Sequence, residues 1–349
     1  MRTSHPRISI ALLTLGAIAL GGCGSSTKNS TSASRHSTQA TSTASTSQTS
    51  ASPPPAVNEP AAAEHPTPVQ FPAAKGRTLE QLASTVGSSA QLGAATGTFT
   101  PGPGRLAFAL NTSSGAFVYA PTAVYVAKSP TSPAKGPFLA PADPMSVAPQ
   151  YRSKQNTGPG GIQAIYAANV PLPHAGTYTV LSLTRTQNGL IGAPGEIAVA
   201  ASSPIPAVGQ RPPAIATDTP ASVGGKTSLL TTRVPPENMS SVSFKDVLGK
   251  RPVALLFSTP QLCISRVCGP VTDIAVELQR KFGNKVAFIH QEVYVNNQPT
   301  SGLRPQLKAF HLRTEPWLFT INRQGKIAAR LEGSFGVNAF TQALQAAMQ

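Results

Sequence analysis

The sequence predicts a multidomain chain in which a long disordered segment precedes an all-β sandwich and then a layered α/β domain. Three observations predict this order. Residues 23–76 are dominated by Ser, Thr, Ala and Pro and show almost no apolar periodicity. Residues 77–203 contain short alternating apolar runs, separated by turns rich in Pro and Gly. In residues 226–349, segments typical of strands alternate with segments typical of helices.

The N-terminus has the layout of an export signal. Two arginines precede an apolar run from Ile8 to Leu20, which is too short to span a bilayer, and small residues then lead to Cys23. The tetrad Leu-Gly-Gly-Cys resembles the lipobox of bacterial lipoproteins, which implies cleavage after residue 22 and a diacylglycerol on the Cys23 thiol. We therefore expect a lipoprotein signal peptide over residues 1–22 and a chain held by lipid at the extracytoplasmic face of the cell membrane.

The charge balance excludes one class of partner. The chain has 28 Lys and Arg residues against 13 Asp and Glu residues, a net charge of +15, yet only 12% of its residues are charged. The surplus thus arises from few acids, and no run of Lys and Arg is present that could follow a nucleic-acid backbone. We expect a membrane partner through the lipid anchor and no nucleic acid.

The predicted sandwich, residues 77–203, begins with a short helix at 78–85 and continues with β-type runs. Near its end, Tyr178 follows His174 at the spacing seen in the strand F corner of immunoglobulin-like domains, which this segment resembles; the resemblance implies that the Tyr178 hydroxyl caps the backbone. No catalytic constellation is present, so we expect a packing or partner-binding module. The predicted strands are 105–110, 123–127, 161–167, 176–182 and 196–200.

A Pro-rich linker at 204–225 leads to the α/β domain, residues 226–349. Its first strand, Val253 to Phe257, is continuously apolar, as expected for a central strand that is buried on both faces. The remaining expected elements are a helix at 271–282, a strand at 286–295, a helix at 303–311, a hairpin of strands 317–321 and 326–331, and a helix at 337–348.

Two cysteines remain once Cys23 is assigned to the lipid. Cys263 and Cys268 lie between the first strand of the α/β domain and its helix. The amino end of a helix carries partial positive charge, which stabilises a thiolate, and Arg266 would add to that potential. A thiolate attacks a disulfide or a peroxide, and a second thiol nearby resolves the product. The pair therefore predicts redox catalysis.

The spacing restricts where the pair lies. In an ideal helix, residues five apart have Cα atoms ~8.6 Å apart, beyond the ~7 Å limit for a disulfide. Cys263 must therefore lie before the helix, or the first helical turn must unwind on oxidation. The run Cys268-Gly-Pro-Val leaves open an alternative in which Cys268 is the nucleophile. We favour Cys263, because the cysteine nearer the N-terminus is usually the exposed one with the lower pKa.

These features together resemble the thioredoxin-like superfamily. The resemblance rests on an apolar strand followed by a cysteine motif and a helix, on Thr314-Glu315-Pro316 before a strand, and on the hairpin from Phe319 to Ile327. It implies that the bond before Pro316 is cis and faces the cysteines, and that Glu315 and Pro316 bind substrate. It also implies protein thiols or disulfides as substrates, a redox partner and no cofactor. The departure is the spacing, because the usual motif has two residues between its cysteines and this one has four.

Other families and roles compete with this interpretation. Atypical peroxiredoxins of the bacterioferritin-comigratory type share the four-residue spacing, but Thr259 and Pro260 do not stand where the peroxiredoxin motif requires them. Copper chaperones of the Sco type pair two cysteines with a histidine, for which His290 and His311 are available, but their motif has three residues between its cysteines. We assign no metal ligands.

A third alternative is that the cysteines form a permanent stabilising disulfide in an oxidising compartment. The chain would then be a non-catalytic binding lipoprotein. Glu292 is a candidate buried base, because it shares a strand face with His290.

Overall fold

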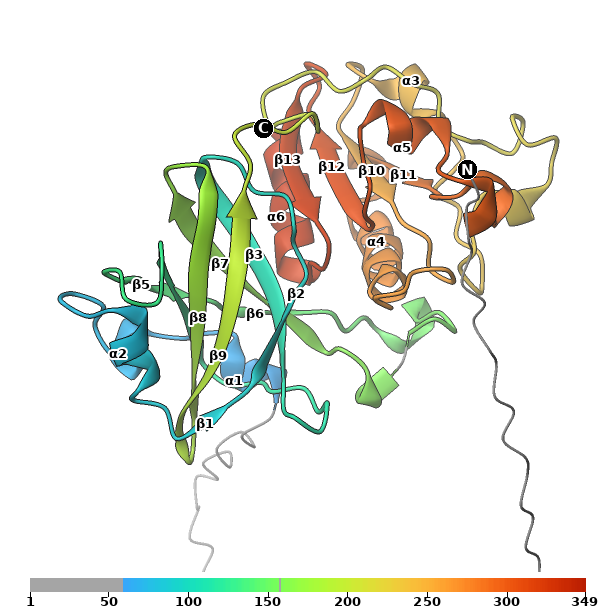
Figure 1. Ribbon diagram of the computed structural model, residues 1–349. Coiled ribbons are helices and arrows are strands. Elements are labelled where there is room, and N and C mark those ends of the chain that lie inside the picture. Colours follow the sequence, from blue (N-terminus) through green and yellow to red (C-terminus); the bar gives the residue numbers. More distant parts are fainter. Residues whose placement is uncertain (1–58, 157) are drawn as a thin grey trace, which may run out of the picture. The chain divides into compact units, whose positions relative to one another are not determined.

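The computed structural model describes residues 59–156 and 158–349. The predicted signal peptide, Cys23 and most of the predicted tether lie outside the described residues. Within the part described, antiparallel and mixed sheets dominate and helices are few, as Figure 1 shows. In that same part, no helix has the length and apolar character needed to cross a membrane.

Two sheets pack face to face in the first half of the described chain, residues 59–203. Their strand orders are β1-β9-β8-β4-β5 and β2-β3-β7-β6. Val124 and Val180 from the first sheet share a core with Phe108 and Tyr166 from the second. The five predicted strands correspond to β3, β4, β7, β8 and β9, whereas the four short ones were not predicted. The strands are β1 (Ser88–Ser89), β2 (Gln91–Ala94), β3 (Gly102–Asn111), β4 (Thr122–Ala127), β5 (Lys135–Leu139), β6 (Ala142–Pro144), β7 (Ala164–Leu172), β8 (Gly176–Thr186) and β9 (Gly189–Val199).

The backbone cap predicted for Tyr178 is present. The Tyr178 hydroxyl donates to the carbonyl of His174 at 3.1 Å and accepts from the amide of the same residue at 3.2 Å. Tyr178 lies in β8 and is 5% exposed. The hydroxyl thus ties the strand to the turn that precedes it.

A third sheet, of four strands, forms the centre of the second half, residues 226–349. Its strand order is β11-β10-β12-β13. Strand β10 is parallel to β11 and antiparallel to β12. Helices α4 and α6 contribute to the core on one face, and α3 and α5 to the core on the other. The elements are α3 (Phe244–Val247), β10 (Val253–Phe257), α4 (Cys268–Phe282), β11 (Ala287–Gln291), α5 (Pro305–Ala309), β12 (Trp317–Ile321), β13 (Ile327–Glu332) and α6 (Val337–Met348).

The predicted order of strands and helices is confirmed from β10 onward, whereas α3 was not predicted. All five residues of β10 are buried, since Ala254 and Leu256 pack with α4 and α6 while the other three face α3 and α5. Helix α5 ends just before His311, which has a φ of 58°. A left-handed residue just after a helix commonly terminates it. Single 3₁₀ turns at 68–70, 149–151, 158–160, 227–229, 283–285, 295–297 and 299–301 complete the elements.

The last part of the predicted tether is folded, so that prediction was wrong for residues 59–76. The segment contains α1 (Pro60–Ala63), and α2 (Leu79–Ala83) follows it. Ala63 is fully buried and Phe71 is 7% exposed. Phe71 packs with Leu82 against the outer face of the five-stranded sheet. The prediction from composition failed here because single apolar residues, which show no periodicity, pack on the outer face of the five-stranded sheet.

The predicted linker at 204–225 contains no helix or strand, but it is packed against the third sheet. Ile205 is 9% exposed and belongs to the core beside α3 and α5. The amide of Gly209 donates to the carbonyl of Ile327 at 2.8 Å, and the amide of Ile327 donates to the carbonyl of Gln210 at 2.9 Å. The segment therefore runs along β13.

The two halves share a hydrophobic core. Ala107 and Ile165, on the outer face of the four-stranded sandwich sheet, pack with Val271 of α4 and Leu344 of α6. The Asp143 carboxylate in β6 accepts from the amides of residues 336, 338 and 339 at 2.8–3.0 Å. A carboxylate on the first amides of a helix satisfies donors that the helix itself cannot. The sandwich thus caps α6.

Candidate functional site

The cysteine pair lies where β10 leads into α4. Phe257 ends the strand, and the chain then turns, with the amide of Cys263 donating to the carbonyl of Thr259 at 3.1 Å. A second turn closes with the amide of Arg266 on the carbonyl of Cys263 at 3.2 Å, and Arg266 has a φ of 58°. Cys268 is the first residue of α4. Cys263 therefore precedes the helix, as the spacing requires for a disulfide-forming pair.

Cys263 has the environment of a reactive thiol. Its pKa falls from the usual 9.0 to about 6, chiefly because the Cys268 thiol donates a hydrogen bond to it. Ser265 Oγ, 3.2 Å from the sulfur, and the amides of Val267 and Cys268 lower that pKa further and outweigh the opposing effect of burial. Cys263 is 7% exposed, and its neighbour Ile264 is 96% exposed.

Cys268 has the opposite character. It has no exposed surface, and burial raises its pKa well above the usual value. The negative charge that Cys263 acquires has the same effect, because a second thiolate beside the first is unfavourable. Both cysteines are free thiols in this structure. At neutral pH the pair therefore holds one proton, which remains on Cys268.

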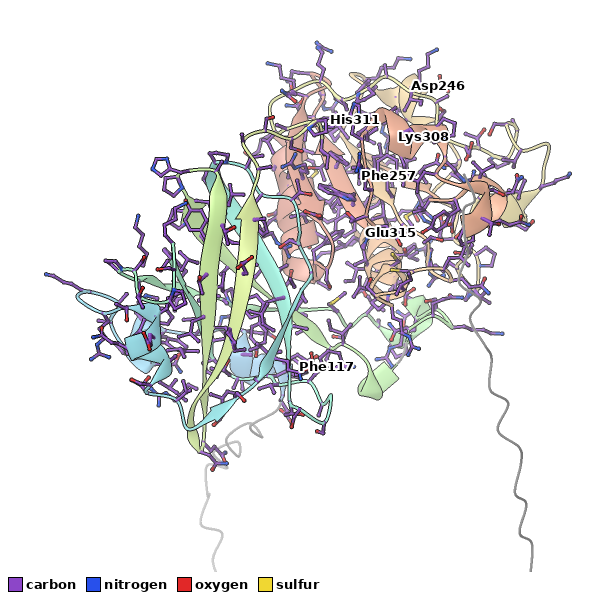
Figure 2. The ribbon with its side chains drawn as sticks, in the orientation of Figure 1. Phe117, Asp246, Phe257, Lys308, His311 and Glu315 are labelled. Atoms are coloured by element: carbon purple, nitrogen blue, oxygen red, sulfur yellow. The ribbon has the colours of Figure 1, made fainter. Side chains whose placement is uncertain are left out.

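Glu315 and Pro316 precede β12, and the bond between them is cis, as predicted. Pro316 has no amide hydrogen, and its carbonyl accepts from the amide of Gly333 at 2.8 Å. Glu315, labelled in Figure 2, is half-buried. Burial, and then the charge on Cys263, raises the pKa of the Glu315 carboxyl to about 7. The Glu315 carboxyl therefore lies within electrostatic reach of the reactive sulfur.

A buried polar chain lies behind Cys268. Thr272 Oγ1 donates to the carbonyl of Cys268 at 2.8 Å and lies 2.7 Å from Ser258 Oγ. Ser258 Oγ lies 3.0 Å from His290 Nε2, and His290 Nδ1 lies 2.8 Å from Glu237 Oε1. These side chains are all buried, so the serine cannot reach a substrate as the nucleophile of a hydrolase triad would. This hydrogen-bonded network instead supports the first turn of α4.

The two ionisable side chains of this hydrogen-bonded network, His290 and Glu237, are paired with each other. Burial opposes a charged His290, but the hydrogen bond and charge of Glu237 outweigh it and raise the pKa of the imidazole. Burial likewise opposes a charged Glu237, but His290 holds the pKa of that carboxyl below its usual value. His290 is therefore engaged at both ring nitrogens. Glu292 accepts from the amide and hydroxyl of Thr232 at 2.6 and 2.8 Å, which gives this carboxylate a structural partner.

The described residues contain no group of three or more His, Cys, Asp and Glu side chains that could hold a metal ion. Of the two histidines considered for copper, His290 is buried behind the cysteines and His311 is exposed at the end of α5.

A long loop of the first half, between β6 and β7, covers the start of α4. A Cβ atom added at Gly269 would lie 2.9 Å from both Cβ and the carbonyl oxygen of Gln155. The amide of Ser153 and the side chain of Asn156 donate to Asp273 of α4 at 2.9 and 3.2 Å. Asp273 is also paired with Arg233 at 2.9 Å, with both side chains buried. The first half of the chain therefore shields the helix turn that contains Cys268.

Sequence reasoning missed several residues of this site. Ser265 had a detectable signal, because it lies two residues after Cys263 and its hydroxyl is a ready donor to a thiolate. Gln155 and Glu237 had none, since each comes from a loop far from the motif in sequence. Only the fold brings them to the helix.

Comparisons with known proteins give little beyond this geometry. No protein-family model matches the chain, and no curated protein matches it. One similar solved structure is a crystal structure described as a candidate thiol:disulfide interchange protein DsbE from Chlorobium tepidum. The match has 16% sequence identity and a TM-score of 0.29, and it covers 41% of this chain and 99% of that chain.

Proposed function

We propose that this protein is a thiol–disulfide oxidoreductase that uses Cys263 as nucleophile and Cys268 as resolving thiol. The observation that carries the proposal is the pair itself. A pKa of about 6 leaves Cys263 about nine-tenths ionised at pH 7. A protonated partner thiol is hydrogen-bonded to it. A low-pKa thiolate with a resolving thiol beside it is what disulfide exchange requires.

Reduction of a substrate disulfide by this pair takes two exchange steps. The Cys263 thiolate attacks one sulfur of a substrate disulfide, so that a mixed disulfide forms and the other substrate sulfur leaves as a thiolate. Cys268 loses its proton and attacks the Cys263 sulfur, which releases the second substrate thiolate and leaves a Cys263–Cys268 disulfide. Two electrons pass from the protein to the substrate, and a dithiol donor must return them. The reverse sequence oxidises a substrate dithiol.

We assign residues 226–349 to the thioredoxin-like class and residues 77–203 to the immunoglobulin-like class. The sheet order β11-β10-β12-β13, with β10 parallel to β11 and the cysteines between β10 and α4, supports the first assignment. The two face-to-face sheets and the bond from Tyr178 to His174 support the second. Since one fold serves many functions, the redox proposal rests on the cysteine environment.

Glu315 is the better candidate of the two predicted substrate-binding residues. Pro316 lacks an amide hydrogen, and its carbonyl is already bonded to Gly333. Glu315 borders a cavity that reaches Ser265, the residue hydrogen-bonded to Cys263. We therefore propose that substrate backbone is held at Glu315, with Pro316 shaping the loop.

The proposed location follows from the N-terminal sequence alone. We propose cleavage before Cys23 and lipid attachment there, which would hold the redox site at the extracytoplasmic face of the membrane. The test is fractionation of cells that express the full chain or its Cys23→Ala variant, with mass spectrometry of the N-terminal peptide. An unmodified peptide, or equal membrane retention of the two chains, would contradict the anchor.

An assay of protein-disulfide reduction tests the redox function. Purified residues 59–349, supplied with dithiothreitol, should accelerate the reduction of a disulfide-bonded test protein. Cys263→Ser should lower the rate to that of dithiothreitol alone, because it removes the attacking thiolate. Equal activity of the wild type and this variant, or no acceleration by the wild type, would favour a non-catalytic binding protein.

A further inference from the structure

A cavity of about 890 Å³ lies beside the cysteine loop, with walls from both halves of the chain. Cavities of this size hold ligands larger than water or a single side chain. Figure 2 labels one residue of each wall, Phe117 in the first half and Glu315 in the second. The cavity residues are 93–97, Ala109, Phe117, 160–162 and Ile165 on the first wall, and 265–267, Thr314, Glu315 and 332–334 on the second.

Direct contacts fix the two walls to each other. A Cβ atom added at Gly333 would lie 1.5 Å from the carbonyl oxygen of Ala95, so the two backbones touch. The amide and hydroxyl of Thr98 donate to the Glu332 carboxylate at 2.9 and 3.2 Å. The amide of Gly333 also bonds to Pro316. The segment after β2 is thus joined, through residue 333, to the loop beside the cysteines.

The first wall offers backbone and small side chains. Most of its members are glycine or alanine, and Gly93, Ala94 and Gly97 are exposed. Strand β2 is the edge of its sheet. The amide of Ala95 bonds to the carbonyl of Ala107 at 2.8 Å, and hydrogen-bonding residues alternate along an antiparallel edge strand, so the amide and carbonyl of Ala94 point away from β3.

We infer that this cavity holds an extended segment of the substrate polypeptide, next to its reactive cysteine, with the first half of the chain as a fixed wall. The inference rests on the oxidoreductase function proposed above. An extended chain matches the unpaired backbone of an edge strand, and its small or apolar side chains match the lining. The cavity borders Glu315 and also Ser265, whose hydroxyl lies 3.2 Å from the Cys263 sulfur, so its occupant would lie beside that sulfur. The substrate class is a polypeptide disulfide in a locally extended, weakly charged segment.

Two disulfide probes test the inference. One is bis(2-hydroxyethyl) disulfide, which has no peptide backbone, and the other is a ten-residue Ala- and Val-rich peptide dimer joined by a central cystine. The variant is Ala94→Trp, which places a large side chain on the cavity wall. Its matched control is Gln91→Trp, because Gln91 is exposed on the same strand and does not border the cavity. The measured quantity is the ratio of the rate with the peptide to the rate with the small disulfide.

We expect Ala94→Trp to lower this ratio about tenfold and Gln91→Trp to change it less than about twofold. An unchanged ratio for Ala94→Trp would overturn the cavity inference while leaving the redox function intact. A wild type that reduces neither probe would instead overturn the redox function.

A second measurement needs no substitution in the wall. A mixed disulfide between Cys263 and the peptide, trapped in Cys268→Ala, should slow amide hydrogen exchange at residues 91–97 relative to the same variant coupled to 2-mercaptoethanol. Equal exchange in the two adducts would also contradict the inference.

Discussion

The turn at 259–266 and the first turn of α4 hold the two cysteines in opposite environments. Cys263 retains some exposure, and hydrogen bonds lower its pKa to about 6. Cys268, five residues later, is fully buried, and burial keeps its thiol protonated. Because the two side chains are chemically identical, their different roles come from their environments. One sulfur meets the substrate, and the other holds the proton until it attacks.

The cover over Cys268 comes mostly from outside the motif. Gln155 of the first half packs against Gly269, the residue that follows Cys268 in α4. The turn around Cys263 is instead local, closed by the carbonyl of Thr259 and the side chain of Ser265. The environment of the reactive thiol is therefore built by residues close to it in sequence. The cover over the resolving thiol also needs a segment that is distant in sequence.

The largest expected effect is a difference between the two single-cysteine variants in the amount of mixed disulfide that they accumulate. With a disulfide-linked peptide, Cys268→Ala should accumulate a mixed disulfide through Cys263, because nothing remains to resolve it. Cys263→Ala should accumulate none, because Cys268 is buried and protonated. Intact-protein mass spectrometry after acid quenching measures both. A mixed disulfide on Cys268 would reverse the assignment and make that cysteine the nucleophile.

The next effect tests the hydrogen bond between the thiols. Removing the donor in Cys268→Ala should raise the pKa of Cys263 by about one to two units, since that bond is the largest cause of its depression. Cys268→Ser keeps a hydroxyl donor and should raise it less. The ultraviolet absorbance of the thiolate, followed against pH, gives both values. Equal pKa values in the two variants would show that the hydrogen bond has no such role.

The pH dependence of the wild type should follow Cys263. The thiolate is the reactive form, so alkylation by iodoacetamide should be half-maximal near pH 6 and should fall about tenfold from pH 7 to pH 5 as the sulfur is protonated. Above pH 7 the rate should be nearly constant. The measurement is mass-spectrometric alkylation of the reduced protein, with Cys263→Ser as the blank. A midpoint near the usual thiol value would contradict the environment described for Cys263.

A smaller effect is expected at Ser265, whose hydroxyl contributes less than Cys268 does. Ser265→Ala should raise the pKa of Cys263 by about half a unit. Ser265→Thr keeps the hydroxyl and serves as the control. The same absorbance titration compares them, and a larger shift in Ser265→Ala than in Cys268→Ala would invert the order of causes.

The smallest effect is expected at Glu315. Its pKa of about 7 leaves most of this carboxyl neutral while Cys263 titrates near pH 6. Glu315→Gln should therefore lower the pKa of Cys263 by no more than about half a unit, since it removes a negative charge that is present mainly above pH 7. A rise in that pKa would show that the carboxyl instead stabilises the thiolate through an uncharged contact.

Several elements were predictable because neighbouring residues decide them. The bounds of β10, β12 and α6 match the expected ranges, since their apolar patterns are continuous or helical over their whole length. The edge strands β1 and β2 were not predictable, because so few residues carry no clear pattern. Residues 59–76 were predicted to be disordered for a similar reason, although Phe71 is buried.

The amino-acid sequence places a cysteine pair between an apolar strand and a helix, and the spacing restricts Cys263 to a position before the helix or in a first turn that unwinds on oxidation. Strand and helix patterns are local, and the spacing of five residues has a simple geometric consequence. The three-dimensional structure was needed to show that Cys263 precedes α4, that Cys268 is fully buried, and which residues cover it. Burial and hydrogen bonding set a pKa, and Gln155 reaches α4 through packing between distant segments. The same packing brings Ala95 against Gly333 and so builds the wall beside the reactive sulfur.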